Sequence, residues 1–218
     1  QIANEVLSSI FDQFYPSTPN NMDRPVNEIF AENLHRAVER INGQLTENPV
    51  ELAKLQSKLG CALTNLGDYR HAQVVLEKAL ATLDQQEKTP QIQELIDFTT
   101  LCLGDCYFGQ GNRELGIEMY ERTLSSVRTN EGNDSQSSLK TMSILGQGYL
   151  HLQKPEIAIS ILEDTMKRQS KALGSDHPDL AVTMSDLSMA YNFLGNSEKS
   201  IELGERAIMM MKKYFLPS

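Results

Sequence analysis

The chain has 218 residues, of which 40% are hydrophobic and 22% are charged, so it can bury the core of one large globular domain or two small ones. Its 29 acidic residues outnumber its 20 basic ones, and the net charge of -9 argues against direct nucleic-acid binding because it repels phosphates. The sequence lacks the run of about 18 uncharged apolar residues that a membrane span requires.

Two helices are predicted before residue 46. Residues 1–14 form the first, because apolar side chains recur there at helical spacing: Ile2, Val6, Leu7, Ile10, Phe11 and Phe14. Residues 15–25 form a turn-rich linker. Residues 26–45 form the second helix, whose apolar stripe consists of Val26, Ile29, Phe30, Leu34, Ala37, Val38, Ile41 and Leu45. We expect this stripe to dock on the residues that follow, so that residues 1–46 form an N-terminal helical cap and linker.

Residues 47–218 contain an internal repeat. A leucine and a small residue precede a tyrosine-like position, a turn residue and further small residues, and this motif begins at Leu59, Leu103, Leu145 and Leu187. The motif therefore recurs every 42 to 44 residues. Each unit is predicted to be a helix hairpin in which small residues let the two helices pack closely. Because one hairpin cannot bury its apolar face alone, the hairpins are expected to stack into an all-α, right-handed superhelical solenoid with a concave wall.

The motif resembles the tetratricopeptide repeat (TPR) family. Its period exceeds the usual 34 residues, and the connector from Gly174 to Pro178 is similar to the Gly-x-x-His-Pro connector of kinesin light chains. The resemblance implies a TPR array of four repeats at about 53–88, 97–130, 139–173 and 181–214. Gly174 then suits a helix C-cap, Asp176 or His177 an N-cap, and Pro178 the first helical turn.

The N-terminal part resembles the region that leads into the repeats of bacterial serine/threonine kinases and related signalling regulators. The matching positions are Leu7, Phe11, Pro16, Arg36, Glu39, Arg40, Ile41, Leu45, Pro49, Leu55, Leu59, Gly60, Leu66, Gly67, Tyr69, Ala72 and Ala79. Ala37 and Val38 depart from the Gly-Ala pair of that family. The resemblance implies a sensing or docking part of a signalling protein, although the chain itself carries no kinase motif.

The sequence predicts no enzyme, no cofactor and no metal site. The three cysteines lack metal-type pairing, and the histidines at 35, 71, 151 and 177 fall on separate segments without a cysteine or carboxylate at ligand spacing. Phosphate-binding loops and nucleophile motifs are missing from the sequence. The cysteines are interpreted as buried thiols, which favours the cytoplasm; a periplasmic domain of a membrane-anchored protein is the alternative.

The family resemblance also places five positions of each first helix on the inner wall of the solenoid. The predicted partner-binding residues are Asn65, Phe98, Leu101, Asp105, Phe108, Gln147, His151, Met189, Asn192 and Phe193. The lysine and asparagine clamp of some relatives is not reproduced, so an apolar groove is predicted. Phe98, Phe108 and Phe193 either anchor a partner or pack between repeats.

The leading functional prediction is a non-enzymatic module that binds a peptide or helix of a partner protein in its concave groove. The alternative is a sensory or regulatory domain of a bacterial signalling protein that responds to a peptide or small ligand. Because the chain begins at Gln1, we expect it to belong to a longer protein. Its apolar C-terminal end, with Met209, Met210, Met211, Phe215 and Leu216, either lacks a further helix or pairs in a homodimer.

Overall fold

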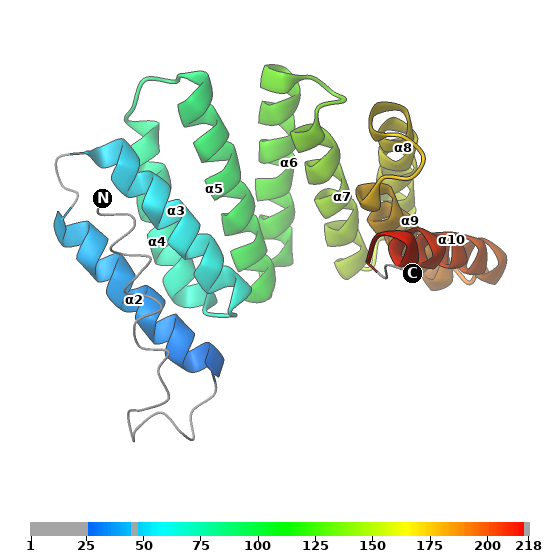
Figure 1. The fold of residues 1–218 in the computed structure, drawn as a ribbon, viewed down its shortest axis with the longest axis horizontal. Coiled ribbons are helices and arrows are strands. Elements are labelled where there is room, and N and C mark those ends of the chain that lie inside the picture. The colour runs from blue at the N-terminus through cyan, green and yellow to red at the C-terminus, as the bar shows by residue number, and fades with distance from the viewer. Residues whose placement is uncertain (1–25, 45–47, 216–218) are drawn as a thin grey trace. The chain divides into compact units, whose positions relative to one another are not determined.

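The computed structural model describes residues 26–44 and 48–215, and within these residues it contains nine helices and no strand (Figure 1). The predicted helix at 1–14 and the linker at 15–25 lie outside the described residues. The helices are α2 (Val26–Gln44), α3 (Pro49–Asn65), α4 (Tyr69–Asp84), α5 (Pro90–Gly109), α6 (Arg113–Glu131), α7 (Gln136–His151), α8 (Pro155–Leu173), α9 (Pro178–Phe193) and α10 (Ser197–Phe215). The prediction of an all-α chain is confirmed.

The helices form pairs joined by short turns, as the repeat predicts: α3 with α4, α5 with α6, α7 with α8, and α9 with α10. The first helix of each pair carries the Leu-Gly-like motif. The chain divides into two compact units, an N-terminal unit of residues 1–116 and a C-terminal unit of residues 117–218. The predicted division into a cap of residues 1–46 and an array of residues 47–218 stays a prediction. In the part of the chain that the structure describes, no helix is long and apolar enough to cross a membrane.

Local sequence explains where the first helices begin. The side chains of Asn48, Thr89 and Ser135 each accept a hydrogen bond from a backbone N–H in the first turn of α3, α5 and α7. Such a cap stabilises a helix by about 1 kcal/mol. At α9 the cap is His177, whose Nδ1 accepts from the backbone N–H of Asp179, and Pro178 occupies the first helical position. His177 rather than Asp176 is therefore the N-cap of the connector.

The turns inside the hairpins share a left-handed residue. Gly67, Gly111 and Gly195 have φ angles of 84°, 86° and 73°, and in the third hairpin the residue with positive φ is Gln153, at 56°. This conformation costs a residue with a Cβ about 1–2 kcal/mol. Glycine relieves that strain but is more flexible in the unfolded chain.

We therefore expect Gln153→Gly to raise the free energy of unfolding by about 0.5–1 kcal/mol. Urea unfolding of the variant and the native chain measures the difference. Gly195→Gln is the matched reverse change in the fourth hairpin, and it should lower the stability by a similar amount. A stability of Gln153→Gly at or below that of the native chain would show that the turn is not strained.

Each unit has a buried apolar core. In the N-terminal unit, Ala53, Ala79, Leu83, Ile92 and Ile96 pack together from α3, α4 and α5. In the C-terminal unit, the buried cluster comes from α7, α8, α9 and α10 and includes Leu150, Ala158, Leu162, Leu180, Met184, Leu187, Ala190, Tyr191, Leu203 and Ala207. The small residues of the repeat allow this packing, because a Cβ on Gly146 would lie 2.5 Å from Cδ2 of Leu162.

Candidate functional site

The first helices α3 and α5 of the N-terminal unit lie side by side and hold a pocket of about 440 Å³ between them. Its lining combines apolar and charged side chains: Val50, Glu51, Lys54 and Lys58 of α3, and Gln91, Ile92, Glu94, Leu95 and Phe98 of α5. The hydroxyls of Ser57 and Thr99 share a buried hydrogen bond of 2.7 Å that ties the two helices together. The pocket therefore has a fixed wall and can take an apolar group with polar partners at its rim.

Of the residues predicted to contact a partner in this unit, Phe98 is accessible, and its role as an anchor stays a prediction. It lines the pocket and is 40% exposed. Phe108 is half-buried. Its ring packs so closely on Gly116 that a Cβ added to Gly116 would lie only 2.1 Å from Cδ2 of Phe108. Phe108 therefore packs against the start of α6. Leu101 and Asp105 are half-buried, and Asn65 is exposed.

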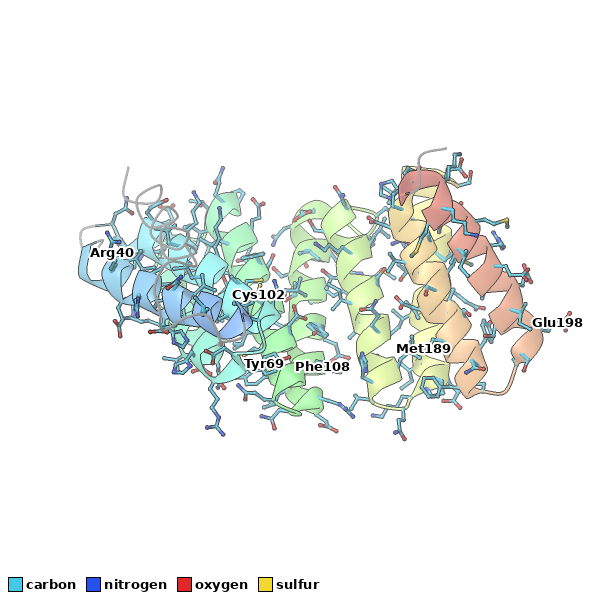
Figure 2. The ribbon with its side chains drawn as sticks, turned by 60° about the horizontal axis from the view of Figure 1, so that its bottom comes forward. Arg40, Tyr69, Cys102, Phe108, Met189 and Glu198 are labelled. Atoms are coloured by element: carbon cyan, nitrogen blue, oxygen red, sulfur yellow. The ribbon has the colours of Figure 1, made fainter. Side chains whose placement is uncertain are left out.

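In the C-terminal unit, α9 presents a line of exposed apolar side chains. Val182, Met189 and Phe193 are 41%, 49% and 59% exposed. Their spacing of seven and four residues places them on one face of the helix. Figure 2 labels Met189 among them. Asn192 and His151, also predicted as contacts, are exposed.

A polar network joins α7, α8 and α9 beneath this surface. Thr183 donates a hydrogen bond of 2.8 Å to Gln169 Oε1, and the hydroxyls of Ser143 and Thr183 lie 3.1 Å apart. Gln147, one of the predicted partner-binding residues, donates from Nε2 to Asp186 Oδ2 at 2.9 Å. Its amide nitrogen thus contributes to the link between α7 and α9.

Asp186 is a buried acid that the sequence analysis missed. Burial raises its pKa to about 6, and the hydrogen bond from Gln147 opposes this rise only in part. The sequence offers only the helical spacing of Asp186 from Thr183 and Ala190, three and four residues away, and the structure shows that all three positions are buried. A carboxyl in that stripe is expected to face the interior.

The three cysteines lie in described helices and form no disulfide with one another. Cys102 and Cys106 are buried, as expected, whereas Cys61 is half-buried. Burial raises the pKa of the Cys106 thiol, and its Sγ donates to the backbone carbonyl of Tyr69 at 2.8 Å. A thiol in this state is a weak nucleophile and a structural group.

At the turn between α3 and α4, the structure corrects the expectation that every histidine lies away from a carboxylate. His35 of α2 and His71 of α4 both contact Asp68, whose oxygens lie 2.7 Å from His35 Nε2 and 2.8 Å from His71 Nδ1. Burial raises the pKa of Asp68, but the hydrogen bond and charge of His71 and the charge of His35 prevail and lower it overall. The i, i+3 spacing of Asp68 and His71 is visible in the sequence, whereas the approach of His35 depends on how α2 packs.

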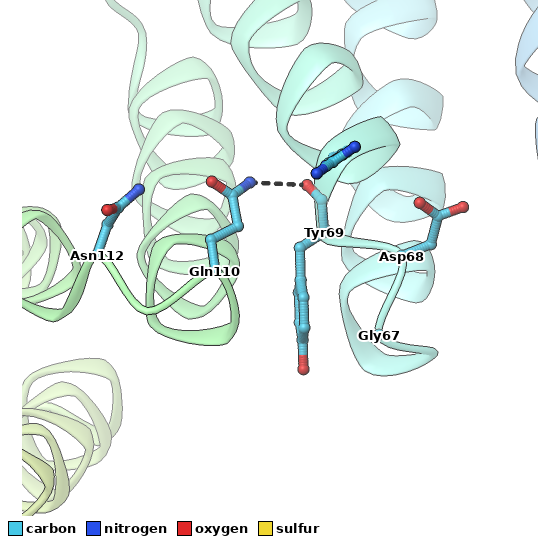
Figure 3. Close-up of a pocket in the computed structure, with 6 residues that line it drawn as sticks. Gly67, Asp68, Tyr69, Gln110 and Asn112 are labelled. Atoms are coloured by element: carbon cyan, nitrogen blue, oxygen red, sulfur yellow. Dashed lines mark hydrogen bonds between the residues drawn. The ribbon is translucent and has the colours of Figure 1, made fainter.

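Asp68 occupies the N-cap position of α4, yet its side chain makes no capping hydrogen bond to the described residues of that helix. An aspartate that caps its helix stabilises it by about 1 kcal/mol. Figure 3 shows its carboxylate pointing away from Gln110 and Asn112, which lie on the other side of the start of α4. A polar pocket of about 460 Å³ lies here, and on its floor Gln110 Nε2 donates to the carbonyl of Tyr69 at 3.2 Å.

The C-terminal helix α10 carries a second group of exposed apolar side chains. Ile201, Ile208 and Met209 are 60%, 55% and 64% exposed. Of the residues expected to form an apolar C-terminal end, Met209 is in this group and Met210 and Met211 are half-buried, whereas Leu216 lies outside the described residues. That this end pairs with a second copy of the chain stays a prediction.

Comparison with known proteins supports the repeat. The tetratricopeptide repeat family matches residues 97–168 and 137–213 in one of its sequence profiles and residues 53–82 in another. These matches together cover more than half of the chain. No curated protein sequence is significantly similar to it.

Solved structures with this fold come from several proteins. A crystal structure of nearly identical TPR-like repeats of a putative kinesin light chain from Podospora anserina has a TM-score of 0.69 at 22% identity, covering 86% of this chain and 87% of that one. The apo form of RapI gives 0.69 at 13% identity, covering 87% of this chain and 50% of that one. The Rap conjugation gene regulator of plasmid pLS20, in complex with the Phr* peptide, gives 0.67 at 14% identity, covering 86% and 49%.

At these identities the structural likeness establishes the fold, and the sequence profiles establish the family. Both agree with the paired helices, the 42- to 44-residue period and the small residues at the helix contacts. Proteins of this fold typically serve as non-enzymatic scaffolds for protein interaction. The chain belongs to the tetratricopeptide repeat family.

Proposed function

We propose that this chain binds a peptide or a helical segment of a partner protein on its first helices. The observation that carries the proposal is the line of Val182, Met189 and Phe193 on α9, each at least 41% exposed. Exposed apolar surface is unfavourable in water, and each Å² of it that a partner covers contributes about 25 cal/mol. On α4, α6 and α8, by contrast, the exposed apolar residues Val74, Leu115 and Ile157 lie on three different helices and form no such line.

The pocket between α3 and α5 offers a second contact surface in the N-terminal unit. Phe98 contributes an apolar side chain to its lining, and Lys54 and Lys58 contribute basic ones. Lys54 Nζ lies 3.6 Å from Glu51, so part of its charge is balanced within α3. A bound segment that places an apolar side chain in the pocket and a carboxylate or carbonyl at its rim would match this lining.

The apolar line on α9 is tested with a random peptide library displayed on phage and selected on the native chain. We expect selected peptides to lose at least about tenfold in affinity for Met189→Ser/Phe193→Ser, because aromatic and methionine side chains dominate contact energies at such surfaces. Fluorescence anisotropy of the labelled peptides measures the dissociation constants. Circular dichroism checks that the variant keeps its helices.

The matched control is Val74→Ser/Ile157→Ser, which removes two equally exposed apolar side chains from the second helices α4 and α8. This variant should bind the selected peptides as the native chain does. Equal loss in both variants would point to a general effect of surface polarity. Unchanged binding by Met189→Ser/Phe193→Ser would refute the proposed contact surface.

A second candidate is a regulatory domain that changes shape when it binds a peptide. The observation in its favour is the likeness to the Rap conjugation gene regulator, which was solved with the Phr* peptide. Small-angle X-ray scattering with and without a selected peptide separates the two candidates. A changed radius of gyration supports regulation, whereas an unchanged one supports a static binding module.

A further inference from the structure

Two imidazoles and one carboxylate meet where α2 packs beside the turn between α3 and α4. His35 Nε2 lies 2.7 Å from Asp68 Oδ2, and His71 Nδ1 lies 2.8 Å from Asp68 Oδ1. The two imidazole rings are in contact, with centroids 4.1 Å apart and planes tilted by 57°. One ligand atom of each residue lies within 4.8 Å of the other two. Three groups that ligate metals therefore converge on one point.

The Asp68 carboxylate contacts these rings instead of capping α4, the helix that begins after it. Asn48 and Thr89, at the equivalent starts of α3 and α5, each use their side chain to cap the helix. Asp68 stands at the start of α4, and within the described residues its side chain does not cap that helix. Its backbone carbonyl accepts from Ala72 at 3.0 Å, so the main chain there is held while the side chain faces the histidines.

The His35 nitrogen supplies an independent indication. Nε2 is buried, and among residues 26–44 and 48–215 it finds no hydrogen-bond partner of acceptable geometry, although Asp68 Oδ2 is only 2.7 Å away. The contact is short but poorly aligned for a hydrogen bond. A buried ring nitrogen in this position can offer its lone pair to a cation placed between the ring and the carboxylate.

We propose that His35, Asp68 and His71 bind a divalent transition-metal ion of the zinc class, with the remaining coordination position open to water. Two imidazole nitrogens and one carboxylate oxygen form a ligand set that Zn²⁺ accepts. Ligand atoms about 2.0–2.2 Å from such an ion lie about 3.3 Å apart. The distances from Asp68 to the two histidine nitrogens would thus increase by about half an ångström on metal binding, which small side-chain rotations allow.

The ligand chemistry also sets the selectivity. Mg²⁺ and Ca²⁺ prefer six or more oxygen ligands, and this site has a single carboxylate. The side chains of His35, Asp68 and His71 are 32%, 23% and 65% exposed, so an ion can reach them from solvent. Bound there, the ion would link α2 to the first hairpin. The site is separate from the first-helix surfaces and does not depend on the proposed function.

Isothermal titration calorimetry of the metal-stripped chain with ZnCl₂, MgCl₂ and CaCl₂ tests the site. We expect one Zn²⁺ per chain and no comparable binding of Mg²⁺ or Ca²⁺. His71→Ala and Asp68→Asn should each weaken Zn²⁺ binding at least about tenfold. Zn²⁺ should raise the melting temperature of the native chain but not of these variants.

The controls separate this site from other ligands and from misfolding. His71 is largely exposed, so His71→Ala should keep the fold, and His151→Ala is the matched histidine control that should bind Zn²⁺ normally. Cobalt substitution reports the ligand type, and the spectrum should lack thiolate-to-metal charge transfer, which excludes the cysteines. The proposal would be overturned if the native chain did not bind Zn²⁺, or if His71→Ala bound it as tightly as the native chain. A thiolate-to-metal band in the cobalt spectrum would overturn it as well. Equal affinity for Mg²⁺ or Ca²⁺ would overturn the assigned metal class.

Discussion

Leu162→Ala is expected to lower the free energy of unfolding by about 3 kcal/mol, within the range of 2–5 kcal/mol for truncation of a buried leucine. Leu162 is fully buried in the core of the C-terminal unit. Its side chain fills the space left by the missing Cβ of Gly146, with Cδ2 2.5 Å from where that atom would stand. Urea unfolding followed by circular dichroism measures the loss.

A double-mutant cycle makes this prediction specific to the close contact. Gly146→Ala alone should destabilise the chain, because overpacking typically costs about 1–3 kcal/mol, against a gain in helix propensity of about 1 kcal/mol. In the Leu162→Ala background the new methyl group meets open space, so the same change should stabilise by about 1 kcal/mol. Equal effects of Gly146→Ala in both backgrounds would show that the two residues are not coupled.

The same design applies in the N-terminal unit, where a Cβ on Gly60 would lie 2.7 Å from Leu76. Leu76 is also fully buried. We expect Gly60→Ala to reverse its sign in the Leu76→Ala background as well. Agreement between the two cycles would show that the close packing of first and second helices is a property of the repeat rather than of one hairpin.

The second large effect is the pH dependence of stability that Asp186 introduces. Its pKa is raised from 3.8 to about 6 by burial, so the folded state binds a proton more tightly than the unfolded state. Its contribution therefore favours folding below pH 3.8, is lost as the pH rises toward 6, and stays unfavourable above that value. The cost above pH 6 is on the order of 2–3 kcal/mol.

Asp186→Asn removes this charge while keeping an oxygen that can accept from Gln147 Nε2. We expect the variant to be about 2 kcal/mol more stable than the native chain at pH 7.5, with the difference shrinking as the pH falls from 6 toward 4. Chemical unfolding at several pH values measures it, and the exposed Glu131→Gln serves as a control for the loss of one acid. A difference that is constant with pH would contradict the raised pKa.

Interactions between residues close together in the sequence made part of the fold predictable. The repeat period and the connector before α9 act within a few residues. Pro178 begins α9 as expected, and of the two N-cap candidates, Asp176 and His177, the structure selects His177. Phe98, Met189 and Phe193 are exposed, and their contact with a partner stays a prediction.

Contacts between helices decided what local sequence could not. Phe108 was an open choice between partner anchor and packing residue, and its contact with Gly116 depends on how the turn after α5 brings Gly116 back to Phe108. Gln147 was expected to face a partner, but its amide nitrogen meets Asp186 from a helix 39 residues later. Equal sequence positions in a repeat thus acquire different roles once neighbouring helices supply different partners.

The sequence by itself determined the family and the alternation of helices and turns, because periodicity, capping and turn preferences are set by residues close together in the chain. Only the tertiary structure brought His35 of α2 to Asp68 and His71, and only it buried Asp186 beside Gln147. Those sites depend on which faces of separate helices meet. That choice is made by packing over the whole unit, and a sequence pattern of one helix does not contain it.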